Sequence, residues 1–342
     1  MSKTIIAGPC SAESREQLYS VACALRRTGR VAKIRAGVWK PRTRPGAFEG
    51  LGEPALGWMQ EIGNELGVEF CCEVARPEHV ELCLHHGLTT VWIGARTTTN
   101  PFMMEEICQA LRGSAVSVMV KNPMCPDVRL WLGAIERLRQ AAIDDITAVH
   151  RGFSMYHNNG YRNAPLWEVA MEFRREMPEV PILCDPSHMG GRADLVASLA
   201  AAARQLDYNG LMVEVHPHPA DAWTDAAQQI TPDELAAIAD AFLAPAAESR
   251  ETSAADMLQA LRGEIDTIDH SLLRLLARRM DLSRQIATVK QRTGMAVYQQ
   301  RRWSDVVEDR RHLADDLGLD TAFTKEILEK IHAESVRIQM EM

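Results

Sequence analysis

The sequence predicts an α/β protein: a (β/α)8 barrel of the TIM type, followed by a small all-α domain of three helices. Three observations predict this fold. Eight short apolar runs alternate with helical stretches over about the first 240 residues, a small polar stretch follows them, and a heptad repeat comes next. The length of 342 residues fits two domains. An open, doubly wound parallel sheet is the alternative for the first part of the chain.

The eight apolar runs are the predicted strands. They are rich in Val, Ile, Cys and Met, and they are bounded by Gly, Pro, Asn or Asp. Continuous apolar runs of this length suit strands that are buried on both faces, as in a parallel sheet. The runs are Thr4–Gly8, Val31–Arg35, Val68–Glu73, Thr89–Ile93, Val116–Lys121, Ile146–His150, Pro181–Cys184 and Leu211–Val215.

Helical stretches lie between these runs. They include Ser14–Thr28, Arg76–His86, Pro101–Leu111, Arg129–Gln140, Pro165–Glu176 and Arg192–Leu206. Eight strands that alternate with helices over this length are typical of a closed barrel, which the sequence favours over the open sheet.

A short polar stretch separates the two predicted domains. Residues 244–254 have no apolar period and are predicted to be a linker between a barrel of residues 1–243 and a helical domain of residues 255–342. After the linker, apolar residues recur at alternating steps of three and four, which is a heptad repeat. Its members are Leu258, Leu261, Ile265, Ile268, Leu272 and Leu275, continued by Leu282, Ile286 and Val289.

The repeat predicts one helix of more than 30 residues that ends at Thr293-Gly294. Two further helices are predicted near Arg301–Asp316 and Thr321–Gln339. Three helices of this size cannot bury the row of apolar heptad residues (the seam) alone. We therefore expect an intertwined homodimer through these helices.

The composition excludes several classes of protein. The chain has 38 basic and 46 acidic residues, a net charge of −8 and 46% hydrophobic residues. An acidic chain of ordinary globular composition is a poor candidate for nucleic-acid binding, and no apolar run is long enough to span a membrane. Eight cysteines without a Cys-x-x-Cys pair indicate free thiols and a cytoplasmic location.

Cations gather where the predicted strands end. A lone Lys or Arg is usually a solvated loop charge, but in a barrel the strand ends converge on one face. Like charges that converge repel one another unless bound anions neutralise them. We therefore expect a substrate that carries phosphate or carboxylate groups. The cations are Lys33, Arg35, Lys40, Arg42, Arg96, Lys121 and Arg151.

A second set of strand-end residues combines a thiol, an imidazole and two carboxylates: Cys10, His188, Glu214 and Asp225. Each alone is more often structural, but they follow strands one, seven and eight, and strand eight neighbours strand one in a closed barrel. This donor set suits a divalent transition ion that polarises a carbonyl. The residues therefore indicate a metal-dependent enzyme that joins or cleaves phosphorylated carbonyl compounds.

Several stretches of the barrel resemble the type I 3-deoxy-D-arabino-heptulosonate 7-phosphate (DAHP) synthases. They are Ala7–Ser14, Lys40–Thr43, Ile93–Arg96, Asp185–His188 and Val213–Pro217. The resemblance covers about residues 3–243 and implies condensation of phosphoenolpyruvate with erythrose 4-phosphate and water. A close relative uses arabinose 5-phosphate and typically carries Asn-Arg-Ser where this chain has Pro41-Arg42-Thr43, so the loop favours erythrose 4-phosphate.

The resemblance implies a role for each matching residue. Cys10, His188, Glu214 and Asp225 hold a divalent ion, Mn²⁺ or similar. Lys40 or a metal-bound water is the expected proton donor to the new hydroxyl. Phosphoenolpyruvate is bound by Arg35, Lys40, Arg96, Lys121 and Arg151, and erythrose 4-phosphate by Lys40, Pro41, Arg42 and Thr43.

The predicted long helix carries cations on its seam. Arg279 and Lys290 are eleven residues apart, which places them on one face, while Arg262 lies about 100° away and would reach a partner chain's site. Ser335 and Gln339 share a face of the last helix. A helical hairpin with solvated cations is one interpretation. A cationic pocket for a small dicarboxylate inside a helical dimer is the other.

Residues 255–342 resemble the all-helical chorismate mutases, through Leu261–Asp266, Leu275–Arg279, Lys290, Arg302, Glu334-Ser335 and Gln339. The resemblance implies that Arg279 and the partner subunit's Arg262 bind the carboxylates of chorismate, while Lys290 and Gln339 approach its ether oxygen. Gln299, Arg302 and Ser335 are further expected contacts. Family members often have Asp at the position of Gln299 and Glu at that of Trp303.

The two resemblances together predict a bifunctional enzyme that forms DAHP in the barrel and rearranges chorismate to prephenate in the helices. The fusion also predicts feedback on the barrel by prephenate or chorismate. A non-catalytic helical domain that senses a ligand and dimerises is the alternative.

Overall fold

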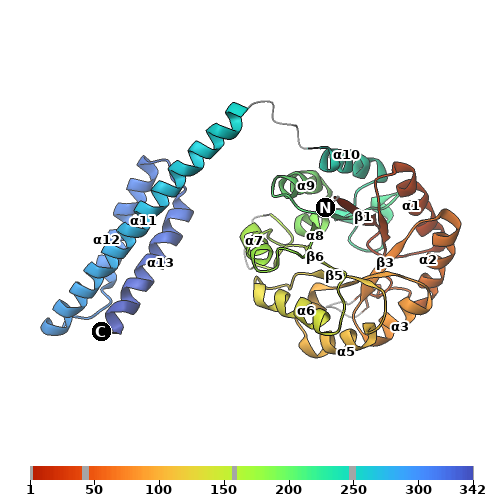
Figure 1. Cartoon of the computed structure of the whole chain (residues 1–342), viewed down its shortest axis with the longest axis horizontal. Helices are drawn as coiled ribbons and strands as arrows, with labels where there is room; N and C mark the ends of the chain where they lie inside the picture. The colour runs from red at the N-terminus through yellow and green to blue at the C-terminus, as the bar shows by residue number, and fades with distance from the viewer. Residues whose placement is uncertain (1–2, 41–45, 156–159, 246–251, 342) are drawn as a thin grey trace. The chain divides into compact units, whose positions relative to one another are not determined.

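The structure is a computed structural model that describes residues 3–40, 46–155, 160–245 and 252–341. It divides into two compact units, Met1–Pro245 and Ala246–Met342 (Figure 1). Most of the predicted linker, residues 246–251, lies outside the described residues.

Eight parallel strands close into a barrel in sequence order, which confirms the barrel over the open sheet (Figure 1). Closure is made by β1 and β8, which pair from Thr4 with Gly210 to Gly8 with Glu214. The strands are β1 (Thr4–Gly8), β2 (Lys33–Arg35), β3 (Phe70–Val74), β4 (Thr90–Ile93), β5 (Ser117–Lys121), β6 (Ile146–His150), β7 (Ile182–Cys184) and β8 (Gly210–Glu214).

Helices pack around the barrel and bury one apolar face each. In α1, for example, the Ser14 side chain accepts a hydrogen bond from the backbone N–H of Gln17, and Gly29 ends the helix with φ of 62°. The principal helices are α1 (Arg15–Thr28), α2 (Glu53–Leu66), α3 (Pro77–His85), α5 (Pro101–Leu111), α6 (Val128–Gln140), α7 (Trp167–Glu176), α9 (Val196–Gln205) and α10 (Pro232–Leu243). Short helices are α4 (Ala95–Thr98) and α8 (Pro186–Gly190).

A glycine at the end of β1 sets the start of the site. Gly8 has φ of 151°, and a Cβ there would lie 2.2 Å from the backbone oxygen of Arg35. No side chain fits at this position, so β1 and β2 approach closely and Cys10 emerges beside the end of β2.

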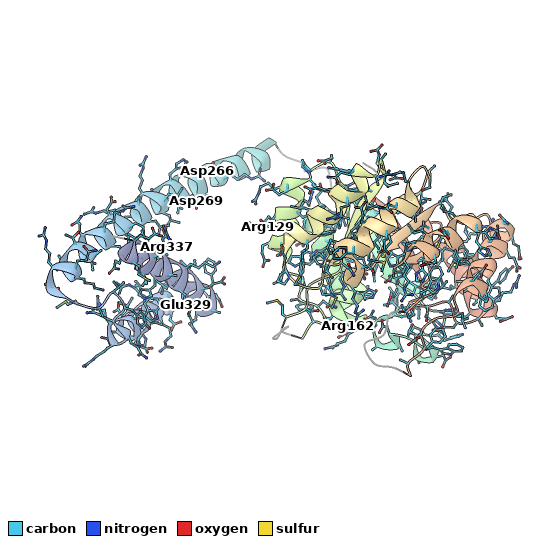
Figure 2. All side chains as sticks on the ribbon, turned by 90° about the horizontal axis from the view of Figure 1, so that it is seen from below. Arg129, Arg162, Asp266, Asp269, Glu329 and Arg337 are labelled. Atoms are coloured by element: carbon cyan, nitrogen blue, oxygen red, sulfur yellow. The ribbon has the colours of Figure 1, made fainter. Side chains whose placement is uncertain are left out.

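Three helices form the second unit, as predicted: α11 (Thr252–Thr293), α12 (Gln300–Asp316) and α13 (Thr321–Met340). Helix α11 begins inside the predicted linker. Its seam residues from Ile265 to Val289 remain exposed on the single chain, as do charged residues such as Asp266 and Asp269 (Figure 2). Among the described residues no helix is long and apolar enough to cross a membrane.

Candidate functional site

Four of the predicted strand-end cations, Lys40, Arg96, Lys121 and Arg151, line one cavity on the carboxyl-terminal face of the barrel. It has a volume of about 300 Å³. Strand β3 contributes Glu73, and the start of α4, directly after β4, contributes Gly94, Ala95 and Arg96. The polar lining of the cavity is Lys40, Glu73, Arg96, Lys121, Arg151, Ser154, Arg162, Asn163, His188 and Asp225. Lys33 does not line this cavity: its Nζ pairs with Glu69 Oε2 at 2.6 Å, and it lines a different cavity.

Three of the four predicted metal ligands converge at this cavity. One ligand atom each from Cys10, Glu214 and Asp225 lies within 4.8 Å of the others. The Cys10 Sγ is 3.4 Å from Asp225 Oδ2. The fourth residue, His188, lies with Nε2 3.7 Å from Glu214 Oε1, outside that triad but next to it.

His188 is oriented by a buried carboxylate. Its Nδ1 lies 2.8 Å from Asp185 Oδ2, and its backbone N–H donates to Asp185 Oδ1 at 3.0 Å. Lys121 Nζ donates to the same carboxylate at 2.9 Å. Burial alone would raise the pKa of Asp185, but His188 and Lys121 hold that pKa well below its usual range. A histidine held through Nδ1 by a carboxylate presents Nε2 as a metal ligand.

Glu214 is fully buried and is held from two sides. Arg35 Nη2 donates to its Oε1 at 2.9 Å, and Gln228 Nε2 donates to its Oε2 at 2.7 Å. The Arg35 guanidinium also lies 5.0 Å from the centre of the Trp92 ring. Arg35 is therefore a buried partner of Glu214, and it is not among the cavity-lining residues.

Lys40 lies against the predicted thiol ligand. Its Nζ donates to Cys10 Sγ at 3.0 Å and to the Cys10 carbonyl oxygen at 2.9 Å. Burial alone would lower the pKa of Lys40, but the Cys10 sulfur when it is ionised, Glu214 and Glu73 raise that pKa, so the amine stays charged. Burial, with Glu214 adding to it, raises the pKa of the Cys10 thiol to about 12. The thiol is protonated at neutral pH unless a cation takes the proton's place.

The remaining cations face the cavity with few carboxylates to balance them. Burial lowers the pKa of Lys121, and burial together with Arg162 and Arg96 lowers the pKa of Arg151 to about 10, although Asp185 opposes both shifts. Arg162, labelled in Figure 2, pairs with Asp225 at 3.1 Å. Cations that depress one another's pKa in a cavity indicate an anionic ligand.

The helical unit brings a second group of predicted residues together. Arg279 donates to the Ser335 hydroxyl and, at 3.4 Å, to the carbonyl oxygen of Ile331. Gln339 Nε2 donates to the Ser335 carbonyl oxygen at 3.1 Å. Lys290 Nζ donates to the Val297 carbonyl oxygen at 2.5 Å.

Other predicted residues are placed differently. Arg262, Gln299 and Arg302 are exposed on the single chain. Pro41, Arg42 and Thr43 lie outside the described residues.

The structure also adds residues that the sequence did not indicate: Arg162, Gln228 and His332. Arg162 follows no strand, and Gln228 lies in a short 3-10 turn, so neither carries a periodic signal.

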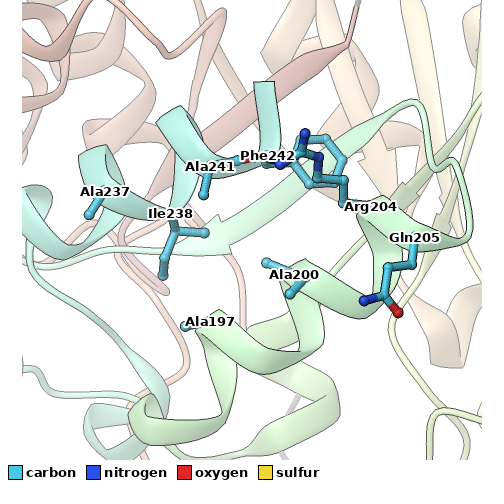
Figure 3. Close-up of a pocket in the computed structure, with 9 residues that line it drawn as sticks. Ala197, Ala200, Arg204, Gln205, Ala237, Ile238, Ala241 and Phe242 are labelled. Atoms are coloured by element: carbon cyan, nitrogen blue, oxygen red, sulfur yellow. Dashed lines mark hydrogen bonds between the residues drawn. The ribbon is translucent and has the colours of Figure 1, made fainter. Parts of the chain in front are cut away.

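A larger cavity of about 530 Å³ lies between α9 and α10, away from these residues (Figure 3). It is lined mainly by alanines, with Ile238 and Phe242. Its only cation among the lining residues is Arg204, which donates to the carbonyl oxygens of Ala241 and Ala244 at the end of α10. It therefore lacks the converging polar groups of the barrel mouth.

Residues 2–245 match the model of the DAHP synthetase I family. The chain belongs to that family. Residues 261–340 match the model of chorismate mutase type II, so this family member carries a helical domain of that type. The predicted fusion of the two is confirmed.

One curated relative and its crystal structure support the match of the barrel. The chain is 33% identical over 227 residues to phospho-2-dehydro-3-deoxyheptonate aldolase of Thermotoga maritima, covering 66% of this chain and 65% of the relative. The chain thus spans just under two thirds of that relative's length. The crystal structure of the Thermotoga maritima enzyme matches with a TM-score of 0.64 and 29% identity, over 70% of this chain and 68% of that one.

Two other relatives match parts of the chain, one over the barrel and one over 78 residues. The 2-dehydro-3-deoxyphosphooctonate aldolase of Bordetella petrii is 25% identical over 268 residues, covering 70% of this chain and 89% of the relative. The T-protein of Enterobacter agglomerans is 36% identical over 78 residues, covering 23% of this chain and 21% of the relative.

Gln228 gives a testable role within this site. It is 1% exposed, it donates to Glu214, and its Oε1 accepts from Arg162 Nη1 at 2.5 Å. We expect Gln228→Leu to weaken Mn²⁺ binding by about 10–100-fold, because residues that orient ligands contribute this much. Calorimetric titration with Mn²⁺ measures the effect, and Gln205→Leu on the exposed face of α9 is the control. Unchanged Mn²⁺ affinity in Gln228→Leu would show that Glu214 is oriented without it.

Proposed function

We propose that this protein catalyses two reactions: condensation of phosphoenolpyruvate with erythrose 4-phosphate and water to DAHP and phosphate in the barrel, and rearrangement of chorismate to prephenate in the helical unit. The observation that carries the first is the cationic cavity that adjoins the triad of Cys10, Glu214 and Asp225. Family membership and the helical domain support both reactions.

The donor set fits a divalent ion, Mn²⁺ or similar. A thiol and two carboxylates form the triad, and a carboxylate-oriented imidazole lies beside them. Three nearby side chains, Arg35, Lys40 and Arg162, each pair with a member of the triad. Cys10, His188, Glu214 and Asp225 would hold the ion. When bound, it would polarise the aldehyde carbonyl of erythrose 4-phosphate.

The residues of the barrel perform the remaining tasks. Lys121, Arg151 and Arg96 bind the phosphate and carboxylate of phosphoenolpyruvate and place its C3 for attack on the aldehyde carbon. A water then adds at C2, and phosphate leaves with cleavage of the C–O bond. Lys40, charged and beside Cys10, donates a proton to the hydroxyl that forms from the aldehyde oxygen. Residues 41–43 would contact erythrose 4-phosphate.

The helical unit needs only electrostatic stabilisation for its reaction. Arg279, together with the partner subunit's Arg262, binds the two carboxylates of chorismate. Lys290 and Gln339 face the ether oxygen, on which negative charge grows as its C–O bond breaks. Ser335, Gln299 and Arg302 complete the expected contacts.

We also propose a homodimer through the helical unit and a cytoplasmic location. The apolar seam of α11 is exposed on the single chain, for example at Leu272, Leu275, Ile286 and Val289, and a contiguous exposed apolar face indicates an interface. The eight cysteines are free thiols, which supports a reducing compartment.

Feedback on the barrel by prephenate or chorismate is a further part of the proposal, supported by the fusion alone. We expect saturating prephenate to lower the synthase rate or its affinity for phosphoenolpyruvate. Synthase assays with and without prephenate measure this, and identical kinetics would exclude feedback. A non-catalytic sensing domain remains the second candidate: it predicts prephenate binding without turnover of chorismate.

The choice of aldehyde can be tested directly. Equal concentrations of erythrose 4-phosphate and arabinose 5-phosphate are offered with phosphoenolpyruvate, and the products are separated. We expect the seven-carbon product to dominate. Dominance of the eight-carbon product would favour the arabinose-using relative.

Arg151 provides a test of the anion site. It is 6% exposed and lines the cavity. We expect Arg151→Leu to raise KM for phosphoenolpyruvate about 10–100-fold, because a charge-assisted hydrogen bond contributes roughly 1.5–3 kcal/mol. Arg151→Lys keeps the charge but loses the planar guanidinium group. Its KM for phosphoenolpyruvate should lie between those of wild type and Arg151→Leu. Arg129→Leu on the exposed start of α6 is the control (Figure 2). An unchanged KM in Arg151→Leu would remove Arg151 from the site.

A further inference from the structure

A half-buried imidazole, His332, lies on the same turn of α13 that Arg279 contacts. Arg279 donates to Ser335 and to the carbonyl oxygen of Ile331, and Ser335 donates to that carbonyl at 3.0 Å. His332 is the next residue after Ile331. It is three residues before Ser335 and seven before Gln339, so the three side chains share one face of the helix.

His332 is held by aromatic rings from two other segments. The Trp303 ring of α12 stacks on it, with centroids 3.9 Å apart and planes 15° apart. Tyr298, which precedes α12, lies 6.0 Å away at 57°. Tyr298 directly follows Val297, whose carbonyl oxygen accepts from Lys290. His332 is thus positioned between the residues contacted by Arg279 and those contacted by Lys290.

Two polar atoms on this face of α13 have no hydrogen-bond partner among the described residues, although both are buried: His332 Nε2 and Gln339 Oε1. A buried polar atom without a partner costs roughly 1–3 kcal/mol. In a site for a small polar ligand, such atoms are satisfied when the ligand is bound.

The uncharged form of His332 suits a hydrogen bond to an uncharged group. Burial lowers the pKa of His332, and the nearby charges of Arg279 and Lys290 lower it further. The ring is therefore neutral at pH 7, and Nε2 can pair with a hydroxyl group, which both donates and accepts.

We propose that His332, positioned by its stack on Trp303, is a substrate-contacting residue of the helical site and hydrogen-bonds the ring hydroxyl of its dicarboxylate ligand. This inference rests on the proposed mutase function. The stack on Trp303 fixes the imidazole in place, and its unpartnered Nε2 supplies the polar contact to the hydroxyl.

The test uses the full-length protein and two readouts, kcat and KM for chorismate and the Kd of prephenate by calorimetry. We expect His332→Leu to raise KM and Kd about 5–10-fold with kcat changed less, and His332→Asn, which retains polar hydrogen-bonding groups, to recover most of the loss. Trp303→Phe, which preserves an aromatic stack, should stay within about twofold of wild type. His312→Leu is the control, since His312 is an exposed residue of α12.

A chorismate analogue that lacks the ring hydroxyl identifies the contact. Wild type and His332→Leu should bind this analogue equally. Two results overturn the inference while the proposed function stands. In the first, His332→Leu loses as much affinity for the analogue as for chorismate; in the second, His332→Leu has wild-type KM and Kd. A wild-type protein that neither converts chorismate nor binds prephenate overturns the proposed function and this inference with it. The synthase rate and thermal midpoint of each variant verify that it is folded.

Discussion

Replacing Cys10 with alanine is expected to reduce the synthase rate about 1,000-fold and to remove high-affinity Mn²⁺ binding, while the mutase rate stays unchanged. The Cys10 thiol lies 3.4 Å from Asp225 and 3.0 Å from Lys40, so its removal takes a ligand from the triad and a neighbour from the charged amine. Lewis-acid polarisation contributes several kcal/mol to a transition state, and about 4 kcal/mol corresponds to three orders of magnitude.

Two comparisons make this result specific. Cys125→Ala removes an exposed cysteine and should leave both rates unchanged. Cys10→Ser keeps the volume but offers a harder, less acidic donor, and should retain a small fraction of the rate. Full synthase activity of Cys10→Ala after treatment with a chelator would show that the triad is not a metal site.

Replacing Lys290 with methionine is expected to reduce kcat for chorismate about 100–1,000-fold and to leave the synthase rate unchanged. Its ammonium group is half-buried and donates to the Val297 carbonyl oxygen at 2.5 Å, which fixes it beside Tyr298 and His332. A preorganised donor aimed at a developing negative charge contributes this much to a rate. Methionine preserves most of the apolar stem, so packing changes little.

The rate at which chorismate absorbance decays measures the mutase activity of the Lys290→Met variant. Lys330→Met is the matched control, because Lys330 is an exposed residue of α13 that pairs only with Glu326 among the described residues. If Lys290→Met rearranges chorismate at the wild-type rate, stabilisation of the ether oxygen does not depend on this cation.

The fold follows from the sequence because its strands are buried on both faces. Such strands appear as continuous apolar runs, and the run at Ile146–His150 coincides with β6. Helix α2 is less apparent, since Gly57 and Gly63 interrupt its apolar period. The heptad repeat likewise predicted α11 because its period spans many turns.

The site was harder to predict where it depends on tertiary contacts. Cys10, Glu214 and Asp225 follow strand ends, so the barrel topology alone placed them together. Arg162 reaches Asp225 from a loop that no periodicity describes. His332 resembles any half-buried helical residue until its stack on Trp303 is seen.

A paired assay decides whether one chain carries two separate active sites. Full-length wild type, Cys10→Ala and Lys290→Met are each measured for DAHP formation and for chorismate loss under the same conditions. With two separate sites, wild type performs both reactions and each variant loses one reaction only. Wild type without turnover of chorismate, or a variant that loses both reactions while remaining folded, would contradict this expectation.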